Sequence, residues 1–367
     1  MGEWKESKLG EYVDSISETY KFKPYEQVVF LNTSDILLGR VINHELQDSA
    51  GLPGQAKKKI KNGDFLFSEI RPANGRYAMI DFNAENYVVS TKLMVLRCND
   101  KIDRNFFKIF LTSKERLEYL QMIAEDRSGT FPQITFDHIY NLDISLPPLF
   151  EQKAIVSVLS SLDDKIDLLQ RQNKTLEAMA ETLFRQWFVE KAQEDWEEGT
   201  LGDLIELVYG KGLKRSERAG VGYPVVGSSG IVGFHSNYLV QGPGIVIGRK
   251  GTLGKTIYIE DNFYPIDTTY YVKSRINSNS LFFEYFLLKN INFEEMNTDS
   301  AVPGLNRNIA LSVELTIPPT ELIKKFSEFT KQVFEKRSNN KSQIRILEKL
   351  RDTLLPKLMS GEVRVAY

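Results

Sequence analysis

Two long stretches of the chain carry apolar residues at the spacing of a coiled coil. After Pro147-Pro148 these positions advance in alternating steps of four and three residues, with one Asn among them: Ile155, Leu159, Leu162, Ile166, Leu169, Asn173, Leu176, Ala180, Leu183 and Trp187. This heptad pattern predicts a helix with one face committed to a helical partner. A helix from residue 151 to residue 190 has 40 residues and a length of about 60 Å.

The second stretch follows Pro318-Pro319 and repeats these steps less regularly. Its predicted seam contains Leu322, Phe326, Phe329, Val333, Asn340, Leu347, Leu350 and Leu354, with Lys336 and Gln343 as further polar members. Pro356 should end or kink this helix, because proline cannot donate the backbone hydrogen bond of a helix interior. Asn173 has two interpretations: a seam asparagine can fix register or orientation, or a frayed seam can leave it facing solvent.

Charge favours pairing of the two helices with each other. Residues 149–195 contain 6 Lys/Arg and 9 Asp/Glu, a net charge of −3, whereas residues 320–360 contain 10 and 5, a net charge of +5. Opposite charges favour association within the chain over self-association of either helix. Long connections permit either direction, but two copies of one unit related by a pseudo-two-fold axis would place the helices antiparallel.

Residues 9–146 and 201–316 have the pattern of mixed α and β structure. Runs rich in β-branched and aromatic residues recur between turn residues and predict strands at 28–31, 64–67, 77–80, 87–96, 244–247, 255–259 and 268–272. A helix-like segment stands near the end of each region, at 106–121 and 281–296. The predicted fold class is α+β.

The chain contains the same unit twice. WKESKLGE at residues 4–11 recurs as WEEGTLGD at 196–203, and DISLPPL at 143–149 recurs as ELTIPPT at 314–320. The second of these repeats is displaced by 171 residues. With the same displacement Pro132 aligns with Pro303, and Lys153 aligns with Lys324. The pattern therefore predicts two mixed α/β domains separated by two long helices that form an antiparallel coiled coil, with an internal pseudo-two-fold repeat.

Composition agrees with a folded protein of two to three domains. The 367 residues are 42% hydrophobic and 26% charged, with a net charge of −2. Proteins that coat nucleic acid alone usually have a large positive excess, so any nucleic-acid role must be local or shared with a partner. The single cysteine, Cys98, fits a reducing compartment. No apolar signal core opens the chain, and the uncharged stretch 221–248 is rich in Gly and Pro, so we expect a cytoplasmic location and no membrane span.

Loops of both globular regions hold side chains suited to nucleic acid. Lys and Arg neutralise phosphates, and Arg, Asn and Gln can hydrogen-bond guanine and adenine edges in pairs. A single side chain of this kind is more often a solvated surface group. The clustering of many such side chains in loops of both copies is what favours a DNA-binding role. The first region supplies Lys57, Lys58, Lys59, Lys61, Arg71, Asn74, Arg76, Lys92, Ser128, Thr130 and Gln133. The second supplies Lys211, Lys214, Arg215, Ser228, Ser229, His235, Arg249, Lys250, Lys255, Asn306 and Arg307.

Catalytic motifs with a specific signal are absent from the sequence. GRKGTLGKT at 248–256 has one residue too many for a P-loop and precedes a strand-like segment, so a Gly-rich hairpin that presents basic residues to a phosphate backbone fits better. The Pro-Pro steps lack the flanking polar and aromatic residues of an amino-methyltransferase loop. With three histidines and one cysteine, no zinc pattern stands out, and neither does a catalytic triad. We expect no catalytic residue, metal or cofactor.

These features together resemble the DNA-specificity subunit of type I restriction-modification systems. The resemblance rests on the duplicated Trp-x4-Leu-Gly-acid opening, the Pro-Pro step into a long helix, the run Glu151-Gln152-Lys153-x-Ile155, and LLPKLMSGEVRV at 354–365. The second copy departs from the first, with Glu321-Leu322-Ile323 after its Pro-Pro.

The resemblance implies a non-catalytic sequence-specificity subunit. Residues 1–146 and 196–316 would be target-recognition domains, each reading one half of a bipartite double-stranded DNA sequence. Residues 147–195 and 317–367 would be spacer helices, the second with a C-terminal tail, that dock two adenine-methyltransferase modification subunits, joined by an ATP-dependent restriction subunit. A ruler of about 60 Å against roughly 34 Å per DNA turn puts the half-site centres one to two turns apart. The alternatives are a self-contained restriction endonuclease or methyltransferase, and a scaffold that binds only proteins.

Overall fold

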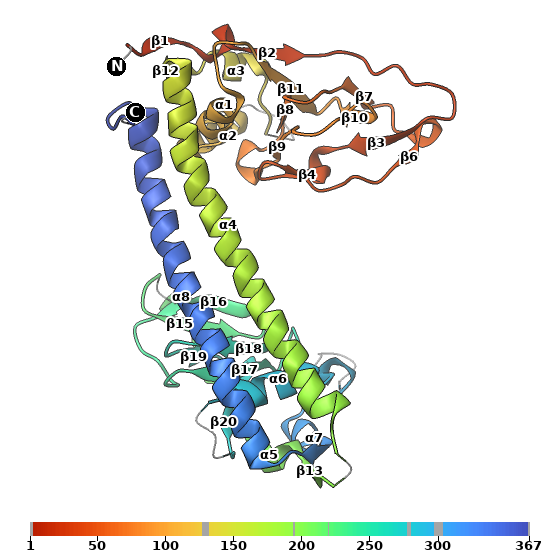
Figure 1. Ribbon diagram of the computed structural model, residues 1–367, viewed down its shortest axis with the longest axis vertical. Coiled ribbons are helices and arrows are strands. Elements are labelled where there is room, and N and C mark those ends of the chain that lie inside the picture. Colours follow the sequence, from red (N-terminus) through yellow and green to blue (C-terminus); the bar gives the residue numbers. More distant parts are fainter. Residues whose placement is uncertain are drawn as a thin grey trace. The chain divides into compact units, whose positions relative to one another are not determined.

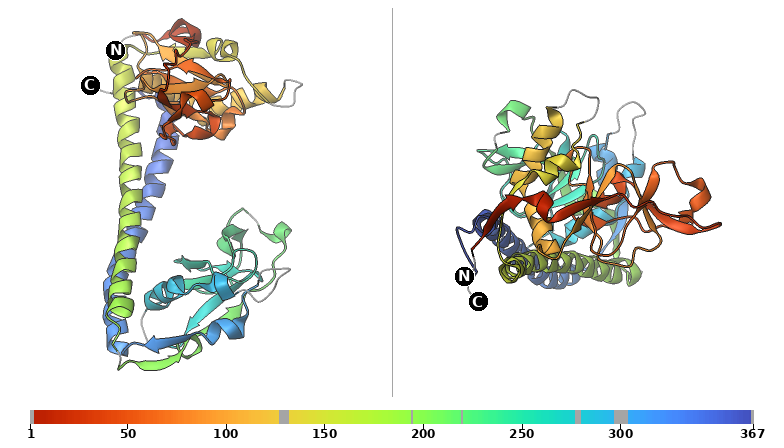
Figure 2. Two further views of the ribbon diagram at one scale, coloured as in Figure 1. Left: turned by 90° about the vertical axis from the view of Figure 1, so that its right-hand side faces the viewer. Right: turned by 90° about the horizontal axis from the view of Figure 1, so that it is seen from above.

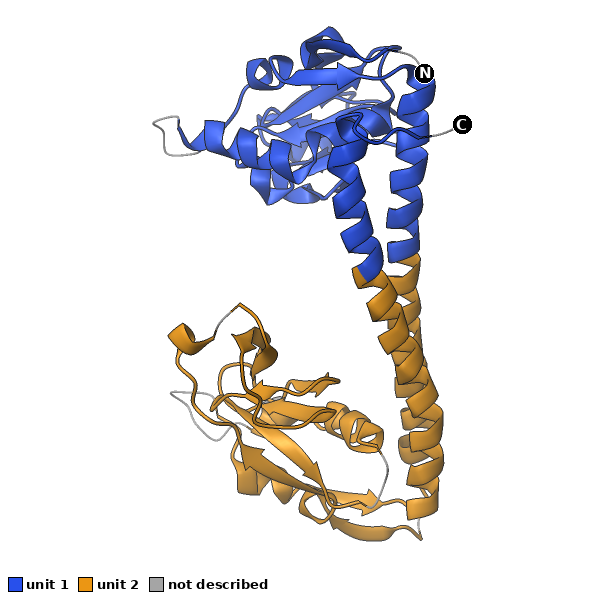
Figure 3. Cartoon of the chain, turned by 90° about the vertical axis from the view of Figure 1, so that its left-hand side faces the viewer, with its two compact units in different colours: residues 1–166, 346–367 blue, residues 167–345 orange. Residues whose placement is uncertain are grey.

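The chain folds into two compact units. The computed structural model describes residues 3–126, 132–193, 195–218, 220–276, 280–296 and 304–365. Unit 1 contains Met1–Ile166 and Ile346–Tyr367, and unit 2 contains Asp167–Arg345 (Figure 3). Each unit combines one globular region with one part of each long helix. We call residues 1–146 globule 1 and residues 196–316 globule 2.

Globule 1 contains two four-stranded sheets, in the orders β2-β11-β8-β9 and β6-β3-β10-β7. The apolar strand β8 is buried along its whole length, as expected for a strand covered on both faces. The strands are β1 (Lys5–Lys8), β2 (Val13–Ile16), β3 (Gln27–Leu31), β4 (Ile36–Leu37), β5 (Arg40–Val41), β6 (Gln47–Asp48), β7 (Ala56–Lys59), β8 (Phe65–Ser68), β9 (Tyr77–Met79), β10 (Tyr87–Ser90), β11 (Leu93–Cys98) and β12 (Asp143–Leu146) (Figure 1). The helices are α1 (Arg104–Leu111), α2 (Lys114–Glu125) and α3 (Phe136–Tyr140), with short 3-10 turns η1 (Leu9–Glu11), η2 (Thr33–Asp35), η3 (Ser49–Gly51) and η4 (Pro72–Asn74).

Globule 2 contains a four-stranded sheet in the order β14-β20-β17-β18 and a three-stranded sheet in the order β16-β15-β19. Its strands are β13 (Glu197–Thr200), β14 (Ile205–Tyr209), β15 (Tyr223–Gly227), β16 (Gly230–His235), β17 (Gly244–Gly248), β18 (Thr256–Ile259), β19 (Tyr264–Pro265), β20 (Thr269–Ser274) and β21 (Glu314–Ile317). Its helices are α5 (Leu201–Leu204), α6 (Phe282–Asn290) and α7 (Arg307–Leu311), with η6 (Arg215–Glu217) and η7 (Phe293–Met296).

The two globules have the same plan. In each, the strand at the opening Trp motif pairs antiparallel with the strand before the Pro-Pro step, β1 with β12 and β13 with β21. Each globule also has one sheet with a parallel pair, β3 with β10 in globule 1 and β15 with β19 in globule 2. The α+β fold with an internal repeat is confirmed. Three predicted segments divide further: 87–96 forms β10 and β11, 106–121 lies in α1 and α2, and 281–296 forms α6 and η7.

The long helices expected after the two Pro-Pro steps are present. α4 covers Leu149–Arg185 and continues as a π-helical turn over Gln186–Glu190, and α8 covers Thr320–Met359. In both units the two helices run antiparallel (Figure 2). In unit 1 the start of α4 contacts the segment after α8, through Glu151 and Arg364, and Asp163 further along contacts the earlier Arg351. In unit 2 Asn173 contacts Asn340, and Glu177 further along contacts the earlier Arg337. Every predicted seam position of the first helix is buried or half-buried. Among the described residues, no helix has the length and apolar character needed to cross a membrane.

The predicted seam of α8 is wrong at four positions. Its exposed members are Phe329, Lys336, Gln343 and Leu350, and the more buried positions lie one residue later, at Thr330, Arg337, Ile344 and Arg351. Three of these are polar and each contacts a polar partner, so apolar periodicity alone could not find them. Thr330 donates to the Phe326 carbonyl at 2.7 Å, Arg337 contacts Glu177 at 3.1 Å, and Arg351 contacts Asp163 at 2.9 Å.

Pro356 does not end the second helix. α8 continues to Met359, because the proline removes one donor while the next turn still bonds to its carbonyl, with Ser360 N–H donating at 3.0 Å. The chain turns away at Gly361, which has a φ of +76°.

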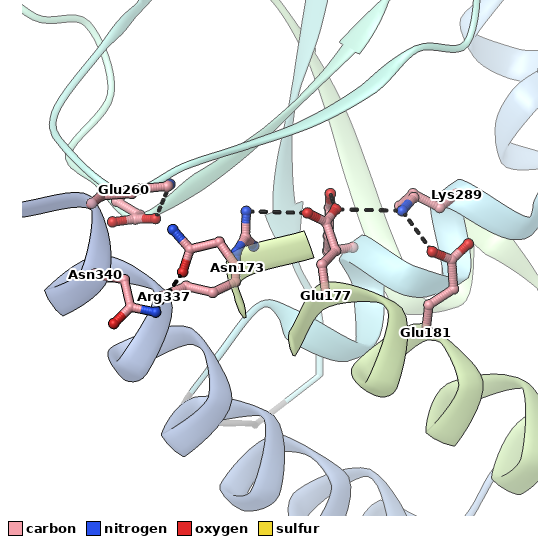
Figure 4. Close-up of polar contacts among 9 residues, drawn as sticks. Asn173, Glu177, Glu181, Glu260, Lys289, Arg337 and Asn340 are labelled. Atoms are coloured by element: carbon pink, nitrogen blue, oxygen red, sulfur yellow. Dashed lines mark hydrogen bonds and ion pairs between the residues drawn. The ribbon is translucent and has the colours of Figure 1, made fainter. Parts of the chain in front are cut away.

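Polar side chains cross the helix seam of unit 2. Asn340 is fully buried and its Nδ2 donates to Asn173 Oδ1 at 3.0 Å, so Asn173 faces its partner helix rather than solvent. One turn further along α4, Glu177 contacts Arg337 at 3.1 Å and Lys289 of α6 at 3.5 Å (Figure 4). These contacts favour the interpretation of Asn173 as a register residue. Lys289 attaches globule 2 to α4, and the ion pair of Glu260 with Lys341 attaches it to α8.

The Glu-Gln pair at the start of α4 holds unit 1 together. Glu151 is fully buried, and Arg364 donates to both of its oxygens, with Nε to Oε1 at 2.7 Å. The arginine lowers the pKa of Glu151. Gln152 donates to the Pro147 carbonyl at 2.8 Å and accepts from the Asp103 N–H at 2.7 Å. The residue at the repeat position of Glu151 is Leu322, so unit 2 has no equivalent ion pair at this site.

Candidate nucleic-acid interface

The loop after β8 meets the segment before α3 at one exposed edge of globule 1. Ile70 forms a β-bridge with Gln133, and Arg71 N–H donates to the Pro132 carbonyl at 3.0 Å. The turn before β11 joins them, because Glu69 N–H donates to the Lys92 carbonyl at 3.2 Å. Four predicted DNA-binding residues are therefore gathered here with exposed side chains, and we call them edge 1: Arg71, Asn74, Lys92 and Gln133.

Globule 2 builds the same junction from its own sequence. Lys250, in the loop after β17, forms a β-bridge with Gly304, and Leu305 N–H donates to the Arg249 carbonyl at 2.9 Å. Gly304 and Leu305 stand 171 residues after Gln133 and Ile134, which is the shift of the sequence repeat. We call the polar residues gathered here edge 2: Arg249, Lys250, Asn306 and Arg307. Both copies thus present one loop pair at equivalent places.

An exposed aromatic ring holds two of the edge 2 arginines. The guanidinium carbons of Arg249 and Arg307 lie 4.9 Å and 5.6 Å from the centroid of the Tyr209 ring, which is 48% exposed. Arg249 also donates to the Asp267 carbonyl at 3.1 Å and lies 5.8 Å from the Tyr270 ring. Burial raises the pKa of Tyr270 to about 12. These cation–π contacts hold two positive groups together on one surface.

Within the described residues, edge 2 lacks an acidic counterpart that would neutralise it. Across the described parts of the chain, no carboxylate forms an ion pair with Arg249, Lys250 or Arg307. Two guanidinium groups and an ammonium without such partners form a site for an anion or for the acceptor atoms of a base.

The Gly-rich segment 248–256 is a hairpin, as expected. β17 and β18 pair antiparallel on either side of it, and Gly251 and Gly254 adopt φ values of +82° and +66°. Lys255 is turned back onto the Ser229 carbonyl at 2.7 Å, in the turn between β15 and β16 that also contains Ser228. Lys250 is exposed on this hairpin, whereas Arg249 and Lys255 each donate to a backbone carbonyl.

Several predicted residues serve the fold instead. Arg76 donates to the carbonyls of Ser34 and Ile36, each at 3.2 Å. The lysine run forms strand β7 rather than a loop, and Lys58 is half-buried, donates to the Leu93 carbonyl at 2.7 Å and has its pKa lowered by burial. Lys59 forms an ion pair with Glu18 at 3.5 Å. Local sequence could not separate these residues from free surface cations.

The remaining candidates lie apart from the two edges. Lys57 and Lys61 are exposed at β7 and at the turn before β8. Lys211, Lys214 and Arg215 are exposed on the segment after β14, and His235 Nδ1 lies 3.0 Å from the Glu217 carbonyl in the same region. Ser128 and Thr130 lie outside the described residues. No group of His, Cys, Asp and Glu able to hold a metal ion occurs within the described ranges.

Two exposed residues at the edges escaped the sequence-based selection. Tyr209 is the last residue of the largely apolar strand β14 and looks like part of the core pattern, although its ring organises edge 2. Leu38 is 67% exposed beside the edge 1 loop and has a φ of +46°. Only the Leu-Gly pair between two short β runs signals it, since two-residue hairpin turns usually contain Asn or Gly at this position.

Comparison with known proteins agrees with the duplicated plan. The family model described as the type I restriction modification DNA specificity domain matches residues 1–178 and 193–349. The chain is similar to the type I restriction enzyme HindI specificity subunit of Haemophilus influenzae, with 31% identity over 99% of this chain and 100% of that protein. It is also 26% identical to the MjaIX specificity subunit of Methanocaldococcus jannaschii, over 72% of this chain and 70% of that one.

Solved structures support the same fold. The S subunit of a type I restriction-modification system from M. genitalium aligns with a TM-score of 0.62 at 20% identity, over 97% of this chain and 96% of that one. A chain from a study of assembly and conformational transition of the type I R-M system aligns with a TM-score of 0.56 at 19% identity, over 99% of both chains. The family model covers most of the sequence, and the chain therefore belongs to the family of type I restriction-modification DNA specificity subunits.

Proposed function

We propose that globule 1 and globule 2 each read one half of a bipartite DNA sequence, through edge 1 and edge 2. The chain has the role of a DNA specificity subunit, which is not catalytic. The observation that carries the proposal is the duplicated junction, in which the loop after a central strand bridges to the segment before a short helix in both globules. Each junction gathers arginine with lysine and amide side chains.

The side chains at the two edges divide by chemistry. Arg71, Arg249 and Arg307 can each donate two parallel hydrogen bonds to a guanine edge, and Gln133 can pair with an adenine edge. Lysines such as Lys250 suit phosphates, which position the protein without reading sequence. With a net charge of −2, the chain alone should bind DNA weakly and depend on partners for much of the electrostatic affinity.

The long helices would set the distance between half-sites and dock the partner subunits. Away from the seam they expose large apolar side chains, including Leu168, Met179 and Ile346, which are 40%, 51% and 66% exposed. Exposed apolar groups on a paired helix suit a protein interface. The partners would be two adenine-methyltransferase modification subunits and an ATP-dependent restriction subunit, acting in the cytoplasm.

The test is sequence-selective methylation by the reconstituted complex. The chain is combined with its methyltransferase subunits and incubated with a DNA library of random sequence. We expect methylated adenines to lie within one bipartite motif, and methylation without regard to flanking sequence would refute the proposal. The chain alone, given Mg²⁺ or a labelled methyl donor, should neither cut nor methylate DNA, whereas a self-contained enzyme would. A protein-only scaffold would leave no DNA footprint even within the complex.

The spacer role has its own test. Removing one heptad from each helix, residues 167–173 and 341–347, keeps the antiparallel pairing of Asp163 with Arg351 and of Glu177 with Arg337. Seven residues shorten a helix by about 10 Å, which is roughly three base pairs of DNA. We expect the spacing between half-sites to shrink by about that amount or recognition to be lost. An unchanged spacing would contradict the spacer role.

A further inference from the structure

Leu38 occupies a backbone position that a leucine rarely adopts. It is the first of two residues between β4 and β5, where Leu37 pairs with Arg40. Leu38 and Gly39 have φ values of +46° and +90°, the combination of a type I′ turn. Such turns favour Asn, Asp or Gly at the first position, because a larger side chain in the left-handed region crowds its own backbone.

The surrounding structure holds this strained turn in place. Leu38 N–H donates to the Gly75 carbonyl at 2.8 Å, and Gly39 N–H donates to the Tyr77 carbonyl at 2.9 Å. Gly75 also makes room for the leucine, since a β-carbon there would lie 2.7 Å from Leu38 Cδ2. A strained conformation maintained by its neighbours points to a use for the side chain that displays it.

The leucine is displayed beside edge 1. Its side chain remains 67% exposed, and the loop to which it is bonded also contains Arg71 and Asn74. Arg71 is exposed as well and shares the left-handed conformation, with a φ of +47°. A polar turn residue would serve the hairpin better, so hydrogen bonding and turn geometry do not explain a leucine here.

We propose that Leu38 contacts the C5-methyl group of a thymine in the half-site that globule 1 reads. Apolar contact with this methyl group is how an aliphatic side chain distinguishes T·A from the other base pairs in the major groove. The inference rests on the proposed function of globule 1. It adds an apolar specificity residue to an edge whose other members are polar.

The test combines Leu38→Gly with removal of the methyl group from DNA. The complex with methyltransferase subunits is assayed on duplexes of its own motif, with each thymine of the globule 1 half-site replaced in turn by deoxyuridine. That half-site is the one altered by Arg71→Ala. Loss of one buried methyl group should slow methylation by the parent complex about fourfold at one position. The Leu38→Gly complex should be slower on the thymine duplex and indifferent to the replacement.

Thermal unfolding separates this role from a structural one. Glycine relieves the backbone strain, so the melting temperature of Leu38→Gly should stay the same or rise by up to about 3 °C. A leucine needed mainly for packing on Gly75 would lower it. The matched control is Tyr25→Gly, at the other end of β3, because Tyr25 has a φ of +59° and is 97% exposed. This control should leave the motif unchanged.

The outcomes are distinguishable. Three results would overturn the inference but not the proposed function. The parent complex could be sequence-specific yet insensitive to deoxyuridine throughout the half-site, or the half-site could contain no T·A pair. The Leu38→Gly complex could also keep the sensitivity to deoxyuridine. A parent complex without sequence preference overturns both.

Leu38 also borders a groove of about 740 Å³ that includes Lys114 and Arg351. If Leu38→Gly prevents the methyltransferase subunits from co-purifying, Leu38 belongs to a protein-docking surface and the inference is wrong.

Discussion

Replacing Arg364 with alanine should destabilise unit 1 by about 3 kcal/mol or more. Glu151 exposes none of its surface, and the Arg364 guanidinium donates to both of its oxygens. Removing one member of a buried pair leaves the other charge without compensation, which typically costs about 3 to 5 kcal/mol. The Arg364 side chain is itself 25% exposed. Water can therefore partly replace it, which favours the lower end of this range.

The chain supplies the control for this variant. The position equivalent to Glu151 in the second repeat is Leu322, which is half-buried. Replacing a buried ion pair by apolar residues of similar size is often neutral or stabilising. We therefore expect the free energy of unfolding of the double variant Glu151→Leu with Arg364→Leu to lie within about 1 kcal/mol of the parent value, although the variant lacks both charges.

Urea unfolding of the chain at pH 5 and pH 8 measures both effects. Arg364 holds the pKa of Glu151 below its usual range, so the pair stabilises the fold above the unfolded-state pKa and loses this effect as pH falls through the lower folded-state value. Without Arg364, burial favours the protonated carboxyl, so the deficit of Arg364→Ala should be larger at pH 8 than at pH 5. A deficit below about 1 kcal/mol at both pH values, or a double variant as unstable as Arg364→Ala, would refute the reasoning.

Three further predictions concern unit 2. Tyr209→Ala should slow methylation of the cognate site about fivefold, the equivalent of about 1 kcal/mol from two cation–π contacts. Tyr209→Phe keeps the ring and should therefore keep most of the rate. Equal losses of rate in both variants would contradict the role of the ring. Burial raises the pKa of Glu284, so stability falls as pH rises from the unfolded-state value toward the folded-state value. Glu284→Gln should unfold at higher urea than the parent at pH 8 and show less pH dependence, and matching pH profiles would contradict this. Asn173→Leu with Asn340→Leu should raise the melting temperature while broadening the half-site spacing seen in the methylome, and a lower melting temperature would show that the pair stabilises the seam.

The architecture could be predicted because repeated local signals produce it. The Pro-Pro steps, the heptads and the duplicated Trp motif predict two globules and two antiparallel helices without any knowledge of tertiary contacts. The prediction of the α8 seam failed where Thr330 and Arg337 turn inward. Their burial depends on contacts with the Phe326 carbonyl and with Glu177, which the heptad pattern does not include. A polar residue is placed by its partner, and no local pattern records that partner.

The site was predicted as a set of residue types rather than as a surface. Arg71 and Gln133, or Lys250 and Arg307, lie far apart in sequence and meet only through bridges between a loop and a distant segment. Conversely, Arg76 satisfies two carbonyls and is not free to bind. Tyr209 and Leu38 were missed because an aromatic or aliphatic residue at a strand end looks the same in sequence whether it is buried or displayed.

The central claim is that each globule reads one half of the DNA target, and one measurement tests it most directly. Methylome sequencing of a host that carries the parent chain, Arg71→Ala or Arg249→Ala would compare the three motifs. The account predicts that Arg71→Ala relaxes one or two positions in one half of the motif, and that Arg249→Ala relaxes positions only in the other half, each by about 1 to 3 kcal/mol of discrimination. Changes in the same half for both variants, or an unchanged motif in both, would contradict it.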